Sequence, residues 1–169
     1  MWNDTDTPLA CLITFRCYGT WLHGDERGST DRVRNIYKSL HIEPSKRWER
    51  HNQRSLTLDP VTLNPHQRTS IEQAISDTCT IRGWYLHALN VRTNHVHVVV
   101  STRGRKGSVV LNALKANATR QMRQDGNWTH PHSPWSDKGS SRYLWNERAV
   151  AAAIDYVLNG QGKELPNLD

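Results

Sequence analysis

Two kinds of hydrophobic pattern alternate along this chain of 169 residues. Short segments rich in β-branched and aromatic residues are typical of strands, and they lie at 9–18, 84–91, 95–101 and 141–145. Apolar residues recur at helical spacing in three other segments, at 65–81, 108–124 and 147–159. This order predicts an α+β, ferredoxin-like βαββαβ antiparallel sheet with two helices on one face, followed by a C-terminal helix.

The predicted helices begin and end at residues with suitable capping chemistry. Asn64, Ser108 and Asn146 are the predicted N-caps. Gly83 and Gly160 are the predicted terminators of the first and last helix. The apolar stripes expected to be buried are, in chain order, Ile71, Ile75, Thr78 and Cys79; Val110, Leu111, Leu114, Ala118 and Met122; and Val150, Ile154, Val157 and Leu158.

His95 and His97 flank a valine on the third predicted strand. Because side chains alternate between the faces of a strand, both imidazoles lie on one face and the neighbouring valines lie on the other. The first and third strands are the central pair of a ferredoxin-like sheet, so Thr14 and Arg16 of the first strand are expected to share a face that looks toward the histidines. Two imidazoles on one face suit two ligands of one metal ion, but such a pair is about as often purely structural.

A long polar stretch, 19–63, follows the first strand and lacks a clear period. A loop of this length inside a compact domain is usually functional or contains short helices. We interpret it as an insertion into a single domain that spans residues 1–169. His23, Asp25 and Glu26 within it are either ligand contacts or parts of a surface excursion, and the second interpretation is slightly favoured.

The chain carries a formal net charge of +6, which is compatible with a polyanionic partner without establishing one. Its 7 tryptophans are many for this length, and Trp128 and Trp135 are candidates for stacking on unpaired bases. The candidates for contacts with the phosphates of such a partner are the cationic residues Arg16, Arg103, Arg105, Lys106, Lys115, Arg120 and Arg123.

The 3 cysteines, Cys11, Cys17 and Cys79, have neither metal-type spacing nor a secretory context. We interpret them as reduced and mostly buried thiols, which are typical of a cytoplasmic protein. No apolar run approaches the length of a membrane span, and the N-terminal residues show no signal-peptide pattern. No membrane partner is therefore expected.

Tyr156, in the C-terminal helix, is a second candidate for chemistry. Counting 100° per residue places it beside the apolar stripe, among small residues that leave room around it. Asn159 lies on the same side, and Gln161 turns back toward the tyrosine if Gly160 adopts a left-handed conformation. A tyrosine in such a position is more often a core-edge residue than a nucleophile, unless a metal site and a basic groove accompany it.

Asn94-His95-Val96-His97 after a strand, together with Tyr156 in the C-terminal helix, resembles the single-tyrosine transposases of the His-hydrophobic-His nuclease superfamily. The resemblance is to the REP-associated tyrosine transposases and their insertion-sequence relatives, and it covers residues 9–162. It implies that the protein cleaves and joins single-stranded DNA next to a hairpin, with His95 and His97 as metal ligands. It further implies that Tyr156 is the nucleophile and forms a 5′-phosphotyrosine linkage. Single-stranded or hairpin DNA is the expected partner, and a homodimer is a further expectation.

The same resemblance implies a third metal ligand one turn after the tyrosine, usually an amide at the fourth position, which here is Gly160. The flanking candidates are Asn159 and Gln161, of which Gln161 is preferred. Mg²⁺ or Mn²⁺ suits phosphate chemistry, and the imidazole ligands shift the preference toward Mn²⁺. A divalent ion polarises the scissile phosphate, while a free tyrosine, with a pKa near 10, needs activation before it attacks.

Two other functions fit some of the same residues. A domesticated relative without catalytic activity would bind hairpin DNA or RNA and not cleave it, and Gly160 in place of an amide favours this alternative. An unrelated zinc hydrolase would use His95, His97 and a third histidine such as His23 or His87. A covalent protein–DNA adduct distinguishes the transposase from both, and tightly bound zinc would indicate the hydrolase.

Overall fold

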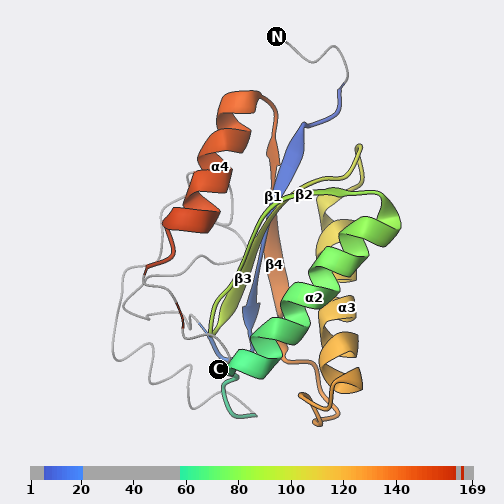
Figure 1. Ribbon diagram of the computed structural model, residues 1–169, viewed down its shortest axis with the longest axis vertical. Helices are drawn as coiled ribbons and strands as arrows, with labels where there is room; N and C mark the ends of the chain where they lie inside the picture. The colour runs from blue at the N-terminus through green and yellow to red at the C-terminus, as the bar shows by residue number, and fades with distance from the viewer. Residues whose placement is uncertain (1–5, 21–57, 163–164, 166–169) are drawn as a thin grey trace.

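The computed structural model describes residues 6–20, 58–162 and 165 of the chain. Its strands are β1 (Ala10–Cys17), β2 (Tyr85–Val91), β3 (His95–Ser101) and β4 (Trp135–Leu144), and its helices are α2 (Pro65–Arg82), α3 (Gly107–Gln124) and α4 (Glu147–Asn159). The strands form one sheet in the order β2-β3-β1-β4, and each neighbouring pair is antiparallel. Helices α2 and α3 cover one face of the sheet, and α4 lies on the other (Figure 1). The predicted fold is confirmed, with β3 and β1 at the centre of the sheet.

The alternation along the two central strands divides the core into two layers. Ile13 and Phe15 of β1 and Val98 of β3 are fully buried in the larger layer, which α2 and α3 complete. The smaller layer lies under α4, where Val99 packs with Val157 and with several alanines and a leucine. The histidines of β3 share the face of this smaller layer, so the polar site and α4 lie on the same side of the sheet.

Helix α2 follows its predicted boundaries. The Asn64 side chain accepts the Gln67 backbone N–H, and the Gln67 side chain accepts the Asn64 backbone N–H. Gly83 ends the helix with a left-handed φ of 69°. The predicted stripes of both helices are buried: Ile71, Ile75, Thr78 and Cys79 in α2, and Val110, Leu111, Leu114, Ala118 and Met122 in α3. Among the described residues, no helix is both long enough and apolar enough to cross a membrane.

The start of α3 differs from the prediction. The N-cap is Lys106 rather than Ser108, and its side chain makes no capping bond. Instead, the Gly107 N–H donates to the Tyr143 hydroxyl of β4 at 3.0 Å. The Tyr143 hydroxyl therefore satisfies an N–H group at the start of α3, a role that the Ser108 side chain was expected to fill.

Strand β4 is longer than predicted, because it begins at Trp135 and not at Ser141. Apart from the buried Trp135, the added residues are polar or glycine and lie on an edge strand, where pairing with β1 satisfies the backbone and the polar side chains reach solvent. The two tryptophans proposed to stack on bases, Trp128 and Trp135, are buried, so this prediction is wrong. Trp135 packs edge-on against Phe15 with ring centroids 4.8 Å apart, and Trp128 donates its indole N–H to the His132 carbonyl.

Helix α4 begins as predicted, with the Asn146 side chain accepting from the Ala149 N–H at 2.8 Å. Its buried residues are Ala153 and Val157, flanked by partly buried Val150 and Ile154. The fourth residue of the predicted stripe, Leu158, is 53% exposed. The stripe is narrower than predicted because α4 covers the sheet with only one side.

Residues 21–57, which hold most of the predicted polar insertion and its His23, Asp25 and Glu26, lie outside the described residues. The end of the insertion belongs to the core, since Val61 and Leu63 are buried. Their N–H groups donate to the Tyr18 and Thr93 carbonyls, which joins this segment to the sheet at the end where the histidines lie.

Candidate metal and tyrosine site

The two histidines lie side by side on the α4 face of the central strand β3. In the pairing with β1, His97 is opposite Thr14 and His95 is opposite Arg16. The imidazole centroids are 4.8 Å apart, and the ring planes meet at 74°. His97 is 3% exposed, whereas His95 is only partly buried. The site therefore has a dry inner imidazole and a more accessible outer one.

The hydrogen bonds of His97 leave one of its nitrogens facing the site. Its Nδ1 lies 2.8 Å from the Thr14 hydroxyl oxygen, and its buried Nε2 has no hydrogen-bond partner among the described residues. When Nδ1–H donates to Thr14, the lone pair of Nε2 points into the site. Burial, reinforced by the neighbouring His95, lowers the pKa of His97 to about 4, and the nearby Gln161 side chain only partly opposes this. The imidazole is therefore neutral at physiological pH.

Nδ1 of His95, like that of His97, faces a side-chain oxygen. Its Nδ1 lies 2.7 Å from the Asn94 side-chain oxygen, which accepts the Nδ1–H. Its Nε2 lies 3.2 Å from the Gln161 side-chain oxygen. That oxygen faces the histidine because the Gln161 amide nitrogen donates to the Tyr156 carbonyl at 3.0 Å. Nε2 of His95 and Oε1 of Gln161 are then two acceptors that face each other.

When each imidazole carries its proton on Nδ1, electron pairs from His95, His97 and Gln161 converge. Facing lone pairs repel one another unless a cation or an additional proton lies between them. Two imidazole nitrogens and an amide oxygen form a donor set that suits a divalent metal ion with positions left for further oxygen ligands. The residues present therefore fit the metal that the resemblance implies. The alternative occupant is a proton on His95.

Tyr156 lies at the edge of this set. Its ring centroid is 5.4 Å from that of His97, the ring planes meet at 70°, and the side chain is 47% exposed. Its position is set by the next residue, since Val157 is fully buried and its carbonyl accepts from the Asn90 side chain of β2 at 2.9 Å. A phenol held beside a buried imidazole and open to solvent is accessible to a large substrate.

The end of α4 directs Gln161 into the site by a route that differs from the prediction. Gly160 has φ −94°, so Gln161 turns back without the left-handed conformation that was the expected condition for this turn. The Gly160 N–H and the Gln161 amide both donate to the Tyr156 carbonyl, each at 3.0 Å. A Cβ at position 160 would lie 2.7 Å from that carbonyl oxygen. Glycine therefore permits the close approach that brings the following side chain to the histidines.

Asn159, the other candidate for the third ligand, is not brought to the histidines. Its side-chain amide donates to the Asp155 carboxylate one turn earlier on α4, at 2.8 Å, and it is exposed. The preference for Gln161 agrees with this geometry. The roles of Asn94 and Asn90 were not predicted from the sequence. Asn94 orients His95, and Asn90 donates to the Val157 carbonyl of α4. Asn90 could have been noticed as an amide at a sheet position otherwise expected to be apolar.

The candidate phosphate contacts lie in three separate places. Arg16 is beside the site, in register with His95. Arg103, Arg105 and Lys106 lie in the turn after β3, at the opposite end of the sheet. Lys115, Arg120 and Arg123 are on α3, on the other face of the sheet. The ammonium group of Lys115 donates to the Ser136 carbonyl at 2.8 Å, and burial lowers its pKa, so it contributes to the fold.

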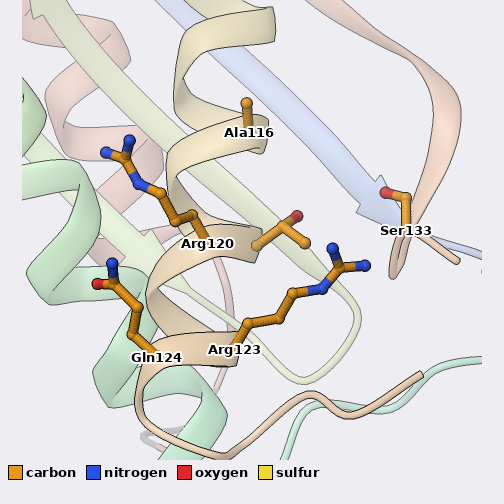
Figure 2. A pocket seen from close by; sticks show the side chains of 6 residues that line it. Ala116, Arg120, Arg123, Gln124 and Ser133 are labelled. Carbon is orange, nitrogen blue, oxygen red and sulfur yellow. The ribbon is translucent and has the colours of Figure 1, made fainter. Parts of the chain in front are cut away.

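A hollow of about 590 Å³ on the outer side of α3 includes Arg120, Arg123 and Ser133 (Figure 2). The Arg123 guanidinium donates to the carbonyls of residues 130–132 at 3.2–3.5 Å, which holds it toward the loop before β4. The Arg120 guanidinium points away from that of Arg123 (Figure 2). The two cations are therefore separate contact points rather than a clamp for one anion.

The zinc-hydrolase alternative lacks a third ligand in the part of the chain that is described. His87 bonds to the Ser101 hydroxyl through Nε2 at 2.7 Å and packs edge-on against Tyr85. No group of three His, Cys, Asp or Glu residues among the described residues is arranged to hold a metal ion. His23, the other histidine considered, lies outside them.

Comparison with known proteins identifies the family. The model of the family described as IS200-like transposases matches residues 60–156, which is more than half of the chain. A solved REP-associated tyrosine transposase bound to a REP hairpin is 12% identical with a TM-score of 0.51, and the alignment covers 93% of this chain and 69% of that one. A candidate transposase from Deinococcus radiodurans R1 is 15% identical with a TM-score of 0.48, covering 94% of this chain and 95% of that one. No curated protein matches the chain. The chain belongs to the family of IS200-like transposases.

Proposed function

We propose that this protein is a DNA transposase that cleaves and joins single-stranded DNA beside a hairpin through a covalent link to Tyr156. The observation that carries the proposal is the convergence of His95 Nε2, His97 Nε2 and Gln161 Oε1 beside the Tyr156 ring. Membership of the IS200-like transposase family agrees with this chemistry.

In this proposal Thr14 and Asn94 hold the imidazoles as neutral ligands, each by accepting an Nδ1–H. Gln161 completes the set of ligands for a divalent ion, Mg²⁺ or Mn²⁺. The bound ion supplies Lewis-acid polarisation of the scissile phosphate and stabilises the negative charge that develops there. Arg16, in register with His95, lies where a guanidinium can contact an adjacent phosphate.

Tyr156 then acts as the nucleophile. Its hydroxyl oxygen loses a proton and forms a bond to phosphorus, while the bond from phosphorus to the 3′-oxygen breaks and that oxygen takes up a proton. The products are a 5′-phosphotyrosine on the protein and a free 3′-hydroxyl on the other strand end. Attack of a 3′-hydroxyl on the phosphotyrosine reverses the exchange, so the same site joins strands without an external energy source.

The DNA partner is proposed from the fold and from charge. The REP-associated transposase with a similar fold is described with a bound REP hairpin, and the present chain has a net charge of +6. Basic side chains lie beside the site, in the turn after β3 and along α3. A hairpin with a single-stranded flank can reach the half-exposed Tyr156 without entering a deep cleft.

The test is formation of a covalent adduct with a 3′-labelled single-stranded hairpin in Mg²⁺ or Mn²⁺, since the fragment attached through its 5′-phosphate carries the 3′ end. We expect an adduct that resists denaturation and disappears in Tyr156→Phe and with a chelator. Tyr85→Phe is the matched control, because Tyr85 is an exposed tyrosine on the outer strand β2. An adduct that persists in Tyr156→Phe contradicts the proposal. Hairpin binding without an adduct in either metal would indicate the non-cleaving relative instead.

A further inference from the structure

Two aromatic side chains are exposed at the end of β4, away from the histidines. Tyr143 is 39% exposed and Trp145, just after the strand, is 54% exposed. Their ring centroids lie 6.1 Å apart, and the ring planes meet at 64°. Tyr143 is in register with Cys11, whose side chain is in the layer under α2 and α3. The exposed rings are thus near the start of α3, on the sheet face opposite the histidines.

A basic turn lies next to Tyr143. The Tyr143 hydroxyl accepts the Gly107 N–H at 3.0 Å, so the phenol is fixed next to the residues that precede α3. Arg105 and Lys106 in this position are both exposed. The turn has a defined backbone, because Arg103 and Gly104 have left-handed φ values of 56° and 85°. The cations are therefore presented by a tight turn and not by a long loop.

We infer that Arg105, Lys106, Tyr143 and Trp145, the aromatic–basic cluster, bind unpaired nucleotides of the DNA at a second contact outside the reacting site. The inference rests on the proposed function, which supplies single-stranded DNA as the ligand. Bases stack on aromatic rings whatever their sequence, and adjacent cations contact the phosphates between them. Among the described residues, the tryptophan suited to stacking is Trp145, since Trp84, Trp128 and Trp135 are buried.

The aromatic–basic cluster lies away from the site where the phosphate would react. Cys11, in register with Tyr143, is three residues along β1 from Thr14, which is about 10 Å at the rise of a strand. Tyr143, in register with Cys11, is also on the other face of the sheet from His97 and Tyr156. The cluster cannot touch the scissile phosphate, so its loss should weaken DNA binding and leave the bond-breaking step unchanged at saturating DNA.

Charge favours a nucleic acid over a second copy of the chain as the occupant. In a two-fold dimer the same patch meets itself, so Arg105 and Lys106 of both copies would come together. Such like charges repel each other at an interface that buries them. A polyanion with exposed bases complements both the cations and the rings.

The affinity test uses the full chain carrying Tyr156→Phe, so that no covalent step contributes. The probe is a fluorescent single-stranded oligothymidine of about 12 nucleotides, a length within the range that stacking surfaces cover. We expect Trp145→Ala to weaken binding by roughly 5- to 150-fold, the effect of losing one stacked base. Trp145→Phe should retain most of the affinity, because it keeps a flat ring. Tyr85→Ala, the loss of an exposed aromatic from the outer strand β2, should change affinity less than Trp145→Ala does.

The cations are tested by the dependence of binding on salt. Replacing Arg105 and Lys106 with glutamine should reduce the slope of log affinity against log salt by about 1.4, or about 0.7 for each lost phosphate contact on a single strand. An oligonucleotide of the same length without bases should bind the parent protein more weakly, and it should bind Trp145→Ala and the parent equally.

Unchanged affinity in Trp145→Ala overturns the inference. So does a Trp145→Ala variant that alters only the self-association of the protein in sedimentation, because that result makes a second copy the occupant. If the native protein forms the adduct but Trp145→Ala binds normally, the proposed function stands and this inference fails. If no adduct forms but Trp145→Ala binds weakly, the inference stands and the chemistry fails.

Discussion

The Thr14 hydroxyl lies 2.8 Å from Nδ1 of His97, on the strand that pairs directly with the histidine strand. A hydroxyl that accepts the Nδ1–H fixes the tautomer that leaves the Nε2 lone pair for a metal ion, and this is the role that we propose for Thr14. We expect Thr14→Val to weaken Mn²⁺ binding by about 10- to 100-fold, the usual effect of losing an orienting partner. Isothermal calorimetry measures this directly. Thr14→Ser, which keeps the hydroxyl, should bind Mn²⁺ almost normally, and equal weakening in both variants would contradict the orienting role.

Gln161 is the proposed third ligand, and its side-chain oxygen lies 3.2 Å from Nε2 of His95. Gln161→Ala should reduce the stabilisation of the protein by Mn²⁺, because a ligand that binds only the folded state raises stability in proportion to the logarithm of its concentration over Kd. Gln161→Glu keeps an oxygen and adds negative charge, so it should retain or increase the stabilisation. Thermal unfolding with increasing Mn²⁺ provides the measurement. If the cation between the two groups is only a proton on His95, neither variant will change the response to Mn²⁺.

Gly160 connects the tyrosine to this ligand. Because a Cβ at position 160 would lie 2.7 Å from the Tyr156 carbonyl oxygen, Gly160→Ala must displace the end of α4. We expect a loss of about 1–3 kcal/mol in the free energy of unfolding, typical of an overpacked site, together with slower adduct formation. Asn159→Ala is the matched control, since its amide bonds only to Asp155 among the described residues, and it should form the adduct at the normal rate. Slow adduct formation by Asn159→Ala would instead indicate that Asn159 is the third ligand.

Tyr156 and His97 approach each other within one chain, with ring centroids 5.4 Å apart. If the tyrosine serves the histidines of its own chain, a mixture of His97→Ala and Tyr156→Phe proteins should form no adduct, because neither chain holds both groups. Gel electrophoresis of the mixture with labelled hairpin DNA tests this. An adduct that appears only in the mixture would show that the tyrosine acts at the site of a partner subunit.

The features that the sequence predicts correctly depend on local periodicity. Alternation along 95–101 places His95 and His97 on the face opposite Val96 and Val98, and helical spacing identifies the buried stripes of α2 and α3. Capping residues such as Asn64 and Gly83 fix helix ends within a residue, because their bonds join atoms only a few positions apart.

The features that the sequence does not predict depend on partners far along the chain. The polar start of β4 forms a strand because β1 offers a free edge, and Trp135 is buried because Phe15 and Thr119 receive its ring and its indole N–H. The orientation of Gln161 is an exception, since it depends on a bond to the Tyr156 carbonyl five residues earlier, and not on a left-handed Gly160. The other two outcomes are tertiary contacts that override local composition.

The buried cysteines give a prediction about stability at alkaline pH. Burial raises the pKa of Cys17 to about 12, and that of Cys11 and of Cys79 to about 11, from an ordinary value of 9.0. Above about pH 9 the unfolded chain loses these protons while the folded chain keeps them, so the free energy of unfolding should fall as the pH rises from about 9 toward 11. Urea unfolding across this range measures the fall, and Cys17→Ala should make it shallower.

At about pH 8 the folded protein should react slowly with a thiol reagent and the urea-unfolded protein rapidly, because the thiolate is the reacting form. Fast reaction of the folded protein at all three cysteines would contradict their burial.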